Sequence, residues 1–290
     1  MIIVKLISGL GNQLFQYAFG RQMALINEVP LKLDASFYET QSLRGYKLNH
    51  YKINAQVATK EEVDNVLKPR DPINKLQQYF TSNNKYYCKE RKWWDYDKSL
   101  LSGRKKNVYL DGYWQSYKYY TEIDEVILNE LSLADESESL AYNVNSTILA
   151  DEQSVSVHIR RGDYITDKDA NRMMGILPLS YYSNAIAHIN NNVPNAQFYI
   201  FSDDLNWAAD NLKIDRPAIM ADVANGQKDY LELDMMSKCR HNIIANSTFS
   251  WWAALLNKND EKIVVGPKNW VALPEVNAGI DVLFPEWIKL

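Results

Sequence analysis

The chain has 290 residues, of which 46% are hydrophobic and 23% are charged, and its formal net charge is −4 at pH 7. These values are typical of a folded globular protein, and the absence of a basic excess argues against nucleic acid as a partner. The sequence shows no apolar run of the roughly 20 residues that a transmembrane segment needs and no secretory signal, and its two distant cysteines, Cys88 and Cys239, predict a cytoplasmic protein without disulfides or a metal site.

The chain opens with the pattern of a strand, a turn, a helix and a second strand. Residues 2–7 are mostly apolar, the next five contain two glycines, a helix is expected over 13–27, and residues 31–33 form the next strand. Such a unit places a glycine-containing turn at a helix N-terminus, where an anion or a sugar hydroxyl can bind. A dinucleotide fingerprint would need a third glycine where Leu14 stands, so that type of site is disfavoured. Asn12 either caps the helix or reaches into a cleft.

Residues 36–120 are rich in aromatic side chains and poor in hydrophobic periodicity. They contain twelve of the nineteen tyrosines, together with Trp93, Trp94 and Trp114. We expect loops and short helices here, whose rings serve either ordinary packing or the recognition of a sugar. Residues 111–116 form a candidate loop after a strand at 107–110, and we place the domain boundary near residue 150.

A predicted strand at 155–159 carries the most distinctive residues of the second half. Apolar and polar residues alternate in it, so His158 and Arg160 share one face, and Gly162 allows a turn after Arg161. In open α/β sheets ligands bind at the carboxyl ends of strands, and two adjacent arginines there suit a pyrophosphate. The alternative is that both arginines pair with structural carboxylates such as Asp163.

The remaining elements alternate between strands and helices, which predicts a parallel sheet with right-handed crossovers. After a polar segment that we interpret as a mobile loop at 165–177, the predicted order is a helix at 178–191, a strand at 197–201, a short helix through Trp207 and Leu212, a strand at 218–220, a helix at 229–239, a strand at 242–245, a helix at 251–256 and a strand at 262–266. The fold class is therefore α/β.

Two further strand ends in this half carry polar groups. Ser202 and Asp203 follow one strand and can accept hydrogen bonds from a guanine or from ribose hydroxyls. The segment 246–250 follows another and opens a helix, whose N-terminus suits a phosphate. Each group also has a local interpretation as a helix cap. Together with the arginines, the three ends favour a site for a nucleotide diphosphate.

With these motifs in view, the sequence resembles glycosyltransferase family 11, the bacterial α-1,2-fucosyltransferases. The motifs that carry the resemblance run in order along the whole chain: 9–18 (GLGNQLFQYA), 112–116 (GYWQS), 158–164 (HIRRGDY), 201–204 (FSDD) and 245–252 (ANSTFSWW). The resemblance implies a GT-B architecture, in which two Rossmann-like domains face a cleft. Residues 1–150 would form the acceptor-side domain, and residues 151–290 would bind the GDP-sugar.

The resemblance further implies an inverting transfer of L-fucose from GDP-β-L-fucose to the 2-hydroxyl of a terminal β-galactoside. The partners would be GDP-fucose and a β-galactoside acceptor glycan, as in the synthesis of a surface glycan or an O-antigen. Related fucosyltransferases need no metal, so we expect no cofactor besides the substrate. Another GDP-sugar transferase and a non-catalytic carbohydrate-binding protein remain alternatives.

The resemblance also implies residue roles. Arg160 would bind the β-phosphate and, with Arg161, neutralise the departing diphosphate; Asp163 is a candidate catalytic base, although a phosphate oxygen or water can also take the proton. The other donor-site candidates are His158 and Asp203 for guanosine, and Ser202, Asn246, Ser247, Thr248 and Phe249. The acceptor or cleft candidates are Gly11, Asn12, Gln13, Tyr113, Trp114 and Gln115.

Overall fold

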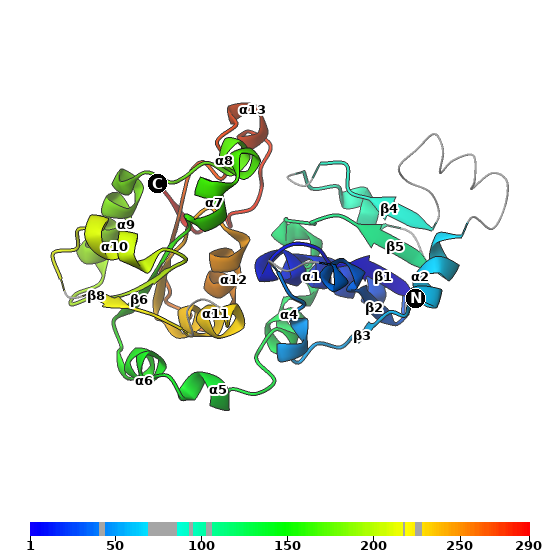
Figure 1. Ribbon diagram of the computed structural model, residues 1–290, viewed down its shortest axis with the longest axis horizontal. Coiled ribbons are helices and arrows are strands. Elements are labelled where there is room, and N and C mark those ends of the chain that lie inside the picture. The colour runs from blue at the N-terminus through cyan, green and yellow to red at the C-terminus, as the bar shows by residue number, and fades with distance from the viewer. Residues whose placement is uncertain (41–43, 69–85, 93–94, 103–105, 217, 224–227) are drawn as a thin grey trace. The chain divides into compact units, whose positions relative to one another are not determined.

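The computed structural model describes the chain except residues 41–43, 69–85, 93–94, 103–105, 217 and 224–227. The described residues divide into two compact units, Met1–Ser132 and Leu133–Leu290. Each unit is built on its own parallel sheet with helices beside it (Figure 1). The predicted α/β class with two Rossmann-like domains is confirmed.

The sheet of the first unit contains five strands among the described residues, in the order β3-β2-β1-β5-β4. Their bounds are β1 Ile2–Lys5, β2 Leu31–Asp34, β3 Gln56–Val57, β4 Tyr87–Lys89 and β5 Val108–Asp111. All neighbouring strands are parallel, with Ile2 opposite both Leu31 and Val108. The carboxyl ends of β1, β4 and β5 therefore lie at one edge of this sheet.

Helix α1 (Leu10–Ile26) packs on this sheet and is buried along most of its length. A side chain at Gly20 would place its Cβ 3.0 Å from Leu31 and 3.1 Å from Val4, so glycine allows the helix to approach the strands closely. The helix begins at Leu10 rather than at residue 13 as predicted, because the amides of Asn12 and Gln13 already donate to the carbonyl of Gly9.

The rest of the first unit consists of short helices and connecting segments. They include α2 (Lys60–Leu67), α4 (Asp124–Glu130) and the 3₁₀ helices η1 (Ser36–Glu39), η2 (Leu48–His50), η3 (Lys98–Leu101), η4 (Tyr117–Tyr119) and η5 (Thr121–Ile123). The expected loops and short helices thus appear where this region is described. Trp93 and Trp94 lie outside the described residues.

The sheet of the second unit has the order β11-β10-β9-β6-β7-β8 among the described residues. Its strands are β6 Ser154–Ile159, β7 Gln197–Ser202, β8 Ala218–Met220, β9 His241–Ile243, β10 Val264–Gly266 and β11 Ile288–Lys289. Every residue of β6 is buried, as expected for an inner strand covered on both faces. Its two serines are satisfied internally: Ser156 accepts a hydrogen bond of 2.7 Å from Asn242, and Ser154 accepts one of 3.1 Å from the Arg240 amide.

Helices cover both faces of the second sheet. They are α5 Ser137–Leu140, α6 Asn143–Ala150, α7 Gly162–Thr166, α8 Lys168–Met174, α9 Leu179–Asn192, α10 Leu205–Asn211, α11 Asp229–Lys238, α12 Thr248–Leu256 and α13 Pro274–Asn277. The expected mobile loop at 165–177 is wrong for most of its length, because α7 and α8 occupy it. Asp167 caps α8 by accepting from the amides of Asp169 and Ala170, and Gly175 ends it at φ 69°.

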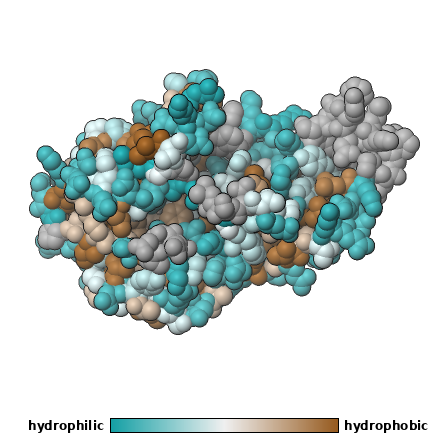
Figure 2. All heavy atoms as spheres, in the orientation of Figure 1, coloured by the Kyte–Doolittle hydropathy of each residue, from teal (hydrophilic) through white to brown (hydrophobic). Residues whose placement is uncertain are grey.

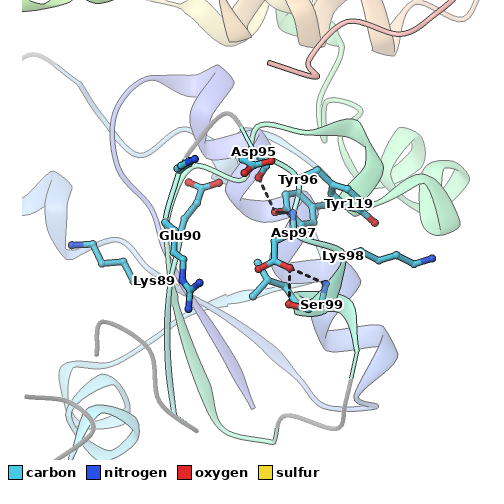
Figure 3. A pocket seen from close by; sticks show the side chains of 11 residues that line it. Lys89, Glu90, Asp95, Tyr96, Asp97, Lys98, Ser99 and Tyr119 are labelled. Carbon is cyan, nitrogen blue, oxygen red and sulfur yellow. Dashed lines mark hydrogen bonds between the residues drawn. The ribbon is translucent and has the colours of Figure 1, made fainter. Parts of the chain in front are cut away.

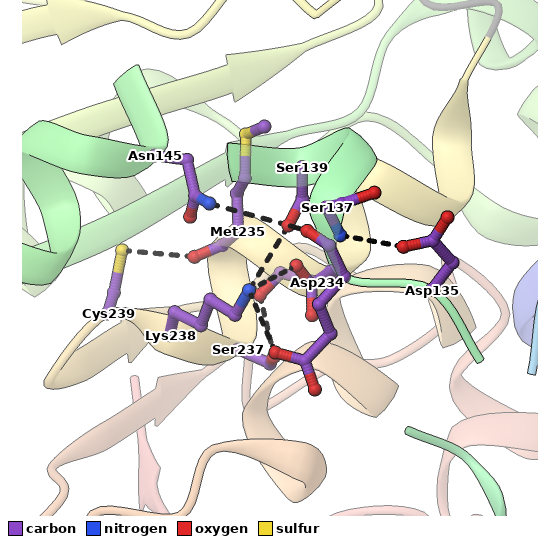
Figure 4. A network of polar contacts seen from close by, with 10 residues as sticks. Asp135, Ser137, Ser139, Asn145, Asp234, Met235, Ser237, Lys238 and Cys239 are labelled. Carbon is purple, nitrogen blue, oxygen red and sulfur yellow. Dashed lines mark hydrogen bonds and ion pairs between the residues drawn. The ribbon is translucent and has the colours of Figure 1, made fainter. Parts of the chain in front are cut away.

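The division between the units falls earlier than the boundary that we placed near residue 150. Helices α5 and α6 belong to the second unit because they pack against α11. A polar network ties them together (Figure 4): the Lys238 ammonium lies 2.7 Å from the Asp234 carboxylate and 3.2 Å from the Ser139 hydroxyl.

The face of the molecule shown in Figure 2 is mainly hydrophilic, and its apolar residues form small separate groups. Among the described residues, no helix is both long enough and apolar enough to cross a membrane. Cys88 and Cys239 are both buried.

Candidate functional site

The carboxyl end of β6 brings two arginines against the end of β7. The two strands pair so that Ile159 lies opposite Ser202, and the residues that follow each strand meet. The Arg160 Nη1 atom lies 2.9 Å from Asp203 Oδ2, while the other oxygen of the same carboxylate accepts a hydrogen bond of 2.8 Å from the Arg161 amide. Asp203 therefore fixes both arginines of the motif.

The Asp203 carboxylate also leaves no room for a side chain at Gly162. A Cβ at this position would lie 2.7 Å from Asp203 Oδ2, which is too close for any side chain without movement of Asp203. The glycine thus lets α7 start directly beside the β7 end. Asp163, the candidate base, lies in α7, and its side chain is outside the described part of the structure.

The Arg161 guanidinium has a second set of contacts. Its central carbon lies 3.6 Å from the centre of the Trp207 ring, and its Nε atom lies 3.5 Å from Asp204 Oδ2. A cation over an indole face is stabilised by the ring quadrupole. Sequence analysis did not identify Trp207 as a site residue, and only its position shortly after the 201–204 motif could have drawn attention to it.

His158 is buried under the arginines and beside α12. Its ring centre lies 5.5 Å from that of Phe249, and only 4% of its surface is exposed. Burial, reinforced by the charge of Arg160, lowers the pKa of His158 to about 3 despite the opposing effect of Asp203. The imidazole is therefore neutral at neutral pH. Its Nδ1 atom has no hydrogen-bond partner within the described residues, so it can exchange a hydrogen bond with a ligand.

The end of β9 leads into the N-terminus of α12. Ser247 caps this helix by accepting from the Phe249 amide at 3.3 Å, and the Ser250 hydroxyl donates to the Ser247 carbonyl. Thr248 is the first helical residue. The local capping interpretation of Ser247 is thus correct, and it is compatible with phosphate binding because the first helical amides still carry partial positive charge.

Asn246 joins this helix start to the segment that follows β6. Its side-chain amide donates to the carbonyls of Met174 (2.8 Å) and Gly175 (3.3 Å). Its own carbonyl accepts from the Tyr164 hydroxyl at 3.0 Å, and the Tyr164 ring faces the Arg160 guanidinium at 5.7 Å. Asn246 therefore positions α7 and α8 next to the arginines.

Glu232 on α11 is a member of this site that sequence analysis missed. Burial is the main cause that raises the pKa of Glu232 to about 8, followed by the charges of Asp229, Asp203 and Asp222, while Arg160 opposes the rise. The charges of both members of the Arg160–Asp203 pair therefore act on this carboxyl. An acidic residue between the buried Leu231 and Leu233 was the only signal in the sequence.

The acceptor or cleft candidates of the first unit converge at the carboxyl end of β1. Ser8 adopts φ 70°, and Asn12 donates to its hydroxyl at 3.0 Å. Gln115 donates to Asn12 Oδ1 at 2.7 Å, so the turn before α1 and the 112–116 motif meet. Gln13 instead braces the backbone, bonding Gly45 O and Lys47 N from a fully buried position. Gly11 is buried in the first turn of α1.

The 112–116 motif is held by Glu90, a second residue that sequence analysis missed. Its carboxylate accepts from the amides of Tyr113 (2.6 Å) and Trp114 (2.9 Å), and a Cβ at Gly112 would lie 2.4 Å from the Glu90 Cβ. Burial raises the pKa of Glu90 to about 7, against the two amide hydrogen bonds. Trp114 adopts φ 57° and is fully buried, with its ring stacked on Phe19 at 4.3 Å.

Asp34 ends β2, about where the ribose-binding acid of a dinucleotide site would lie. Its carboxylate accepts from the Tyr109 hydroxyl (2.6 Å) and the Ser36 amide (3.0 Å), which makes it a structural group. Within the described residues, no three His, Cys, Asp or Glu side chains are arranged to hold a metal ion.

Two open parallel sheets, with arginines and a helix N-terminus at the carboxyl edge of the second, define the GT-B class of glycosyltransferase. The solved structure of the α-1,6-fucosyltransferase NodZ soaked with GDP-fucose has this fold; it matches 88% of this chain and 92% of its own with a TM-score of 0.50 at 12% identity. A NodZ structure from Bradyrhizobium matches with the same TM-score at 13% identity, over 87% of this chain and 91% of its own.

Sequence comparison specifies the family. The model of glycosyl transferase family 11 matches residues 1–290, and the chain belongs to this family. An α-1,2-colitosyltransferase of Escherichia coli is 30% identical over 100% of this chain and 99% of its own. The O-antigen biosynthesis glycosyltransferase WbnK of Escherichia coli is 32% identical over 97% of this chain and 98% of the WbnK chain. A galactoside 2-α-L-fucosyltransferase, Sec1 of Mus musculus, is 26% identical over 63% of this chain and 51% of its own.

Proposed function

We propose that this glycosyltransferase moves L-fucose from GDP-β-L-fucose to the 2-hydroxyl of a terminal β-galactoside. The observation that carries the proposal is the pair Arg160 and Arg161, oriented by Asp203 at the strand end beside the N-terminus of α12. Two guanidiniums and the positive end of a helix suit the two charges of a diphosphate. The fucosyltransferase names among its relatives support fucose as the sugar.

The mechanism that we propose is a single displacement with inversion at the anomeric carbon. The galactose 2-hydroxyl attacks, the bond between the fucose anomeric carbon and the diphosphate oxygen breaks, and negative charge develops on the departing GDP. Arg160 and Arg161, with the Ser247–Phe249 helix start, stabilise that charge in the transition state. No divalent metal or other cofactor is required in this scheme, and retention of activity in excess EDTA tests that expectation.

The remaining donor contacts follow from the polar groups around the arginines. We assign the neutral His158 and the carboxyl of Glu232 to the guanosine, together with Ser202 and Asp203. For the proton of the attacking hydroxyl, Asp163 stays our candidate base. His158 is a poor base in neutral solution because its pKa is about 3.

A second donor is favoured by one relative. Because the Escherichia coli colitosyltransferase aligns with the entire chain, GDP-colitose is the alternative donor. Colitose lacks the 3-hydroxyl of L-fucose, so the two donors differ by one hydrogen-bonding group. A site that bonds that hydroxyl would discriminate strongly against colitose, whereas an apolar pocket would not.

The decisive experiment is linkage analysis of the product. The protein is incubated with a panel of β-galactosides and, in turn, GDP-fucose, GDP-colitose, GDP-mannose and UDP-galactose. We expect a fucosyl group on the 2-hydroxyl of galactose with the first donor only. If the protein prefers GDP-colitose, colitose replaces fucose as the transferred sugar in this proposal, and the assignment of the diphosphate site is unchanged.

Calorimetry with GDP separates the enzyme from a carbohydrate-binding protein. The proposed enzyme binds GDP, and Arg160→Ala weakens that binding. A protein that binds the galactosides but shows no affinity for GDP and no arginine dependence would contradict the proposed function.

A further inference from the structure

We propose that a cavity of about 700 Å³ after β4 in the first unit binds the sugar residues of the acceptor that precede its terminal galactoside. The inference rests on the proposed function, because it assumes a galactose-terminated acceptor. The lining of this cavity includes Glu90, Asp95, Tyr96, Asp97, Ser99 and Tyr119 (Figure 3).

The cavity lies where the topology of the first sheet favours ligand binding. Strand β4 ends at Lys89, opposite Asp111 at the end of β5, and Glu90 is the next residue. Ligands of open parallel sheets bind beyond the carboxyl ends of the strands. The volume also falls within the roughly 300–1,000 Å³ of small-molecule sites.

Glu90 connects this cavity to the acceptor candidates described above. The same carboxylate that lines the cavity accepts the amide hydrogen bonds of Tyr113 and Trp114. The following residue, Gln115, bonds Asn12 at the β1 end. A saccharide whose terminal galactose reaches Asn12 and Gln115 can therefore extend its preceding sugars into the cavity.

The lining has the chemistry of a site for a neutral saccharide. The partly exposed Tyr96 ring meets the buried Tyr119 ring edge to face, with centres 4.9 Å apart, and Tyr119 is anchored by donating to the Asp95 carbonyl at 3.4 Å. Carboxylates accept hydrogen bonds from sugar hydroxyls, and aromatic rings cover the apolar faces of sugars.

Charged groups of both signs line the cavity, with Arg91 and Lys92 beside the acidic residues. In Figure 3 the side chains of Lys89 and Lys98 extend away from the space between Glu90 and Asp97. The carboxylates of Asp95 and Asp97 remain on its walls, and Asp97 is held by the amide and hydroxyl of Ser99 at 2.9 and 2.6 Å. These carboxylates can accept hydrogen bonds from sugar hydroxyls.

The test compares long and short acceptors in the full-length protein. Galactose-terminated tetrasaccharides, lacto-N-tetraose and lacto-N-neotetraose, are compared with methyl β-galactoside in wild type and in Asp95→Asn. A lost hydrogen bond to a charged group costs about 1.5–3 kcal/mol, so we expect KM for at least one tetrasaccharide to rise about tenfold or more. KM for methyl β-galactoside, kcat and GDP affinity should stay unchanged.

Two further variants make the comparison specific. Tyr96→Ala removes a ring from the cavity wall and should reproduce the loss for the long acceptors. Asp64→Asn, on the exposed surface of α2, is the matched control and should change nothing. Equal KM values for long and short acceptors in wild type, or cavity variants that weaken both equally, would overturn the proposal.

Direct binding separates this proposal from the proposed function. Calorimetry with the tetrasaccharides and no donor measures the cavity without any transfer. If transfer fails with every donor but the tetrasaccharides bind wild type and not Asp95→Asn, the proposed function fails and the cavity assignment stands. If transfer succeeds but Asp95→Asn binds and uses the tetrasaccharides normally, only the cavity assignment fails.

Discussion

Arg160 and Arg161 each contact a carboxylate beyond the end of β7, Asp203 and Asp204 respectively. The sequence left two interpretations open, structural ion pairs or an anion site, and the geometry allows both at once. A guanidinium has five N–H donors, so one that is oriented by a carboxylate retains others for a diphosphate. Preorganisation of this kind reduces the ordering cost of binding.

Replacement of Arg160 by alanine should reduce transfer by at least about 100-fold, on the scale of losing one group that stabilises developing charge. Arg160→Lys should recover only part of the rate, because an ammonium does not reproduce the bidentate geometry. The measurement is kcat with GDP-fucose and a β-galactoside, with unfolding by denaturant as the check on folding. Arg240→Ala, an exposed arginine of the same unit, is the control. A folded Arg160→Ala enzyme with near-normal kcat would exclude the leaving-group role.

Glu90 should make stability fall as the pH rises from about 4.5 to 7. Its pKa is raised from 4.5 to about 7 in the folded state, so over this range the unfolded chain releases the proton first and ionisation favours unfolding. One pKa unit corresponds to about 1.4 kcal/mol, so the contribution is on the order of 2–3 kcal/mol.

The measurement is the free energy of unfolding in urea at pH 5 and pH 8. We expect Glu90→Gln to lose less stability than wild type between the two values, and the exposed Glu61→Gln to behave as wild type. A pH dependence of Glu90→Gln that matches wild type would show that this carboxyl has an ordinary pKa.

At the scale of elements, the inner strands of both sheets were predictable because inner parallel strands are short, apolar runs bounded by polar turns. The short edge strands β3, β4 and β11 were not predicted. The carboxyl ends of β6, β7 and β9 were predictable for the same reason, and with them the donor candidates. Helices α7 and α8 were not, since they are short and polar and lack an apolar stripe. Local capping at Asp167 and Gly175 defines the bounds of α8 instead.

That cap gives a prediction for α8. Asp167→Ala removes the acceptor of the Asp169 and Ala170 amides and should destabilise the helix by about 1 kcal/mol. Hydrogen exchange of the amides in 168–174 should become several-fold faster, whereas Asp169→Ala, which removes a charge but no cap, should change exchange much less. Unchanged protection in Asp167→Ala would mean that tertiary contacts alone hold α8.

At the scale of the whole molecule, two parallel sheets followed from the alternation of strands and helices, and the family from motifs spread along the chain. Glu90 and Glu232 did not follow, because their partners are distant in sequence. The division between the two units differs from our boundary near residue 150 for a similar reason: the polarity of 135–145 resembles a linker, yet Ser139 bonds Lys238 and Glu138 bonds Tyr230.

These contacts predict that residues 133–290 form a more stable fragment than residues 151–290. Both fragments contain the proposed donor site, but the shorter one lacks α5 and α6 and exposes the face of α11 that they cover. Thermal unfolding should give a Tm several degrees higher for 133–290, and calorimetry should show tighter GDP binding. Equal Tm values would place the functional boundary near residue 150 after all.

Trp114 shows a conflict between backbone and side chain that bears on protein engineering. The left-handed conformation alone favours glycine by about 1–2 kcal/mol, whereas truncating a buried aromatic costs about 3–5 kcal/mol. The indole stacked on Phe19 therefore outweighs the torsional penalty. A library selected for heat tolerance should retain tryptophan here, although a rule that installs glycine wherever φ is positive would remove it.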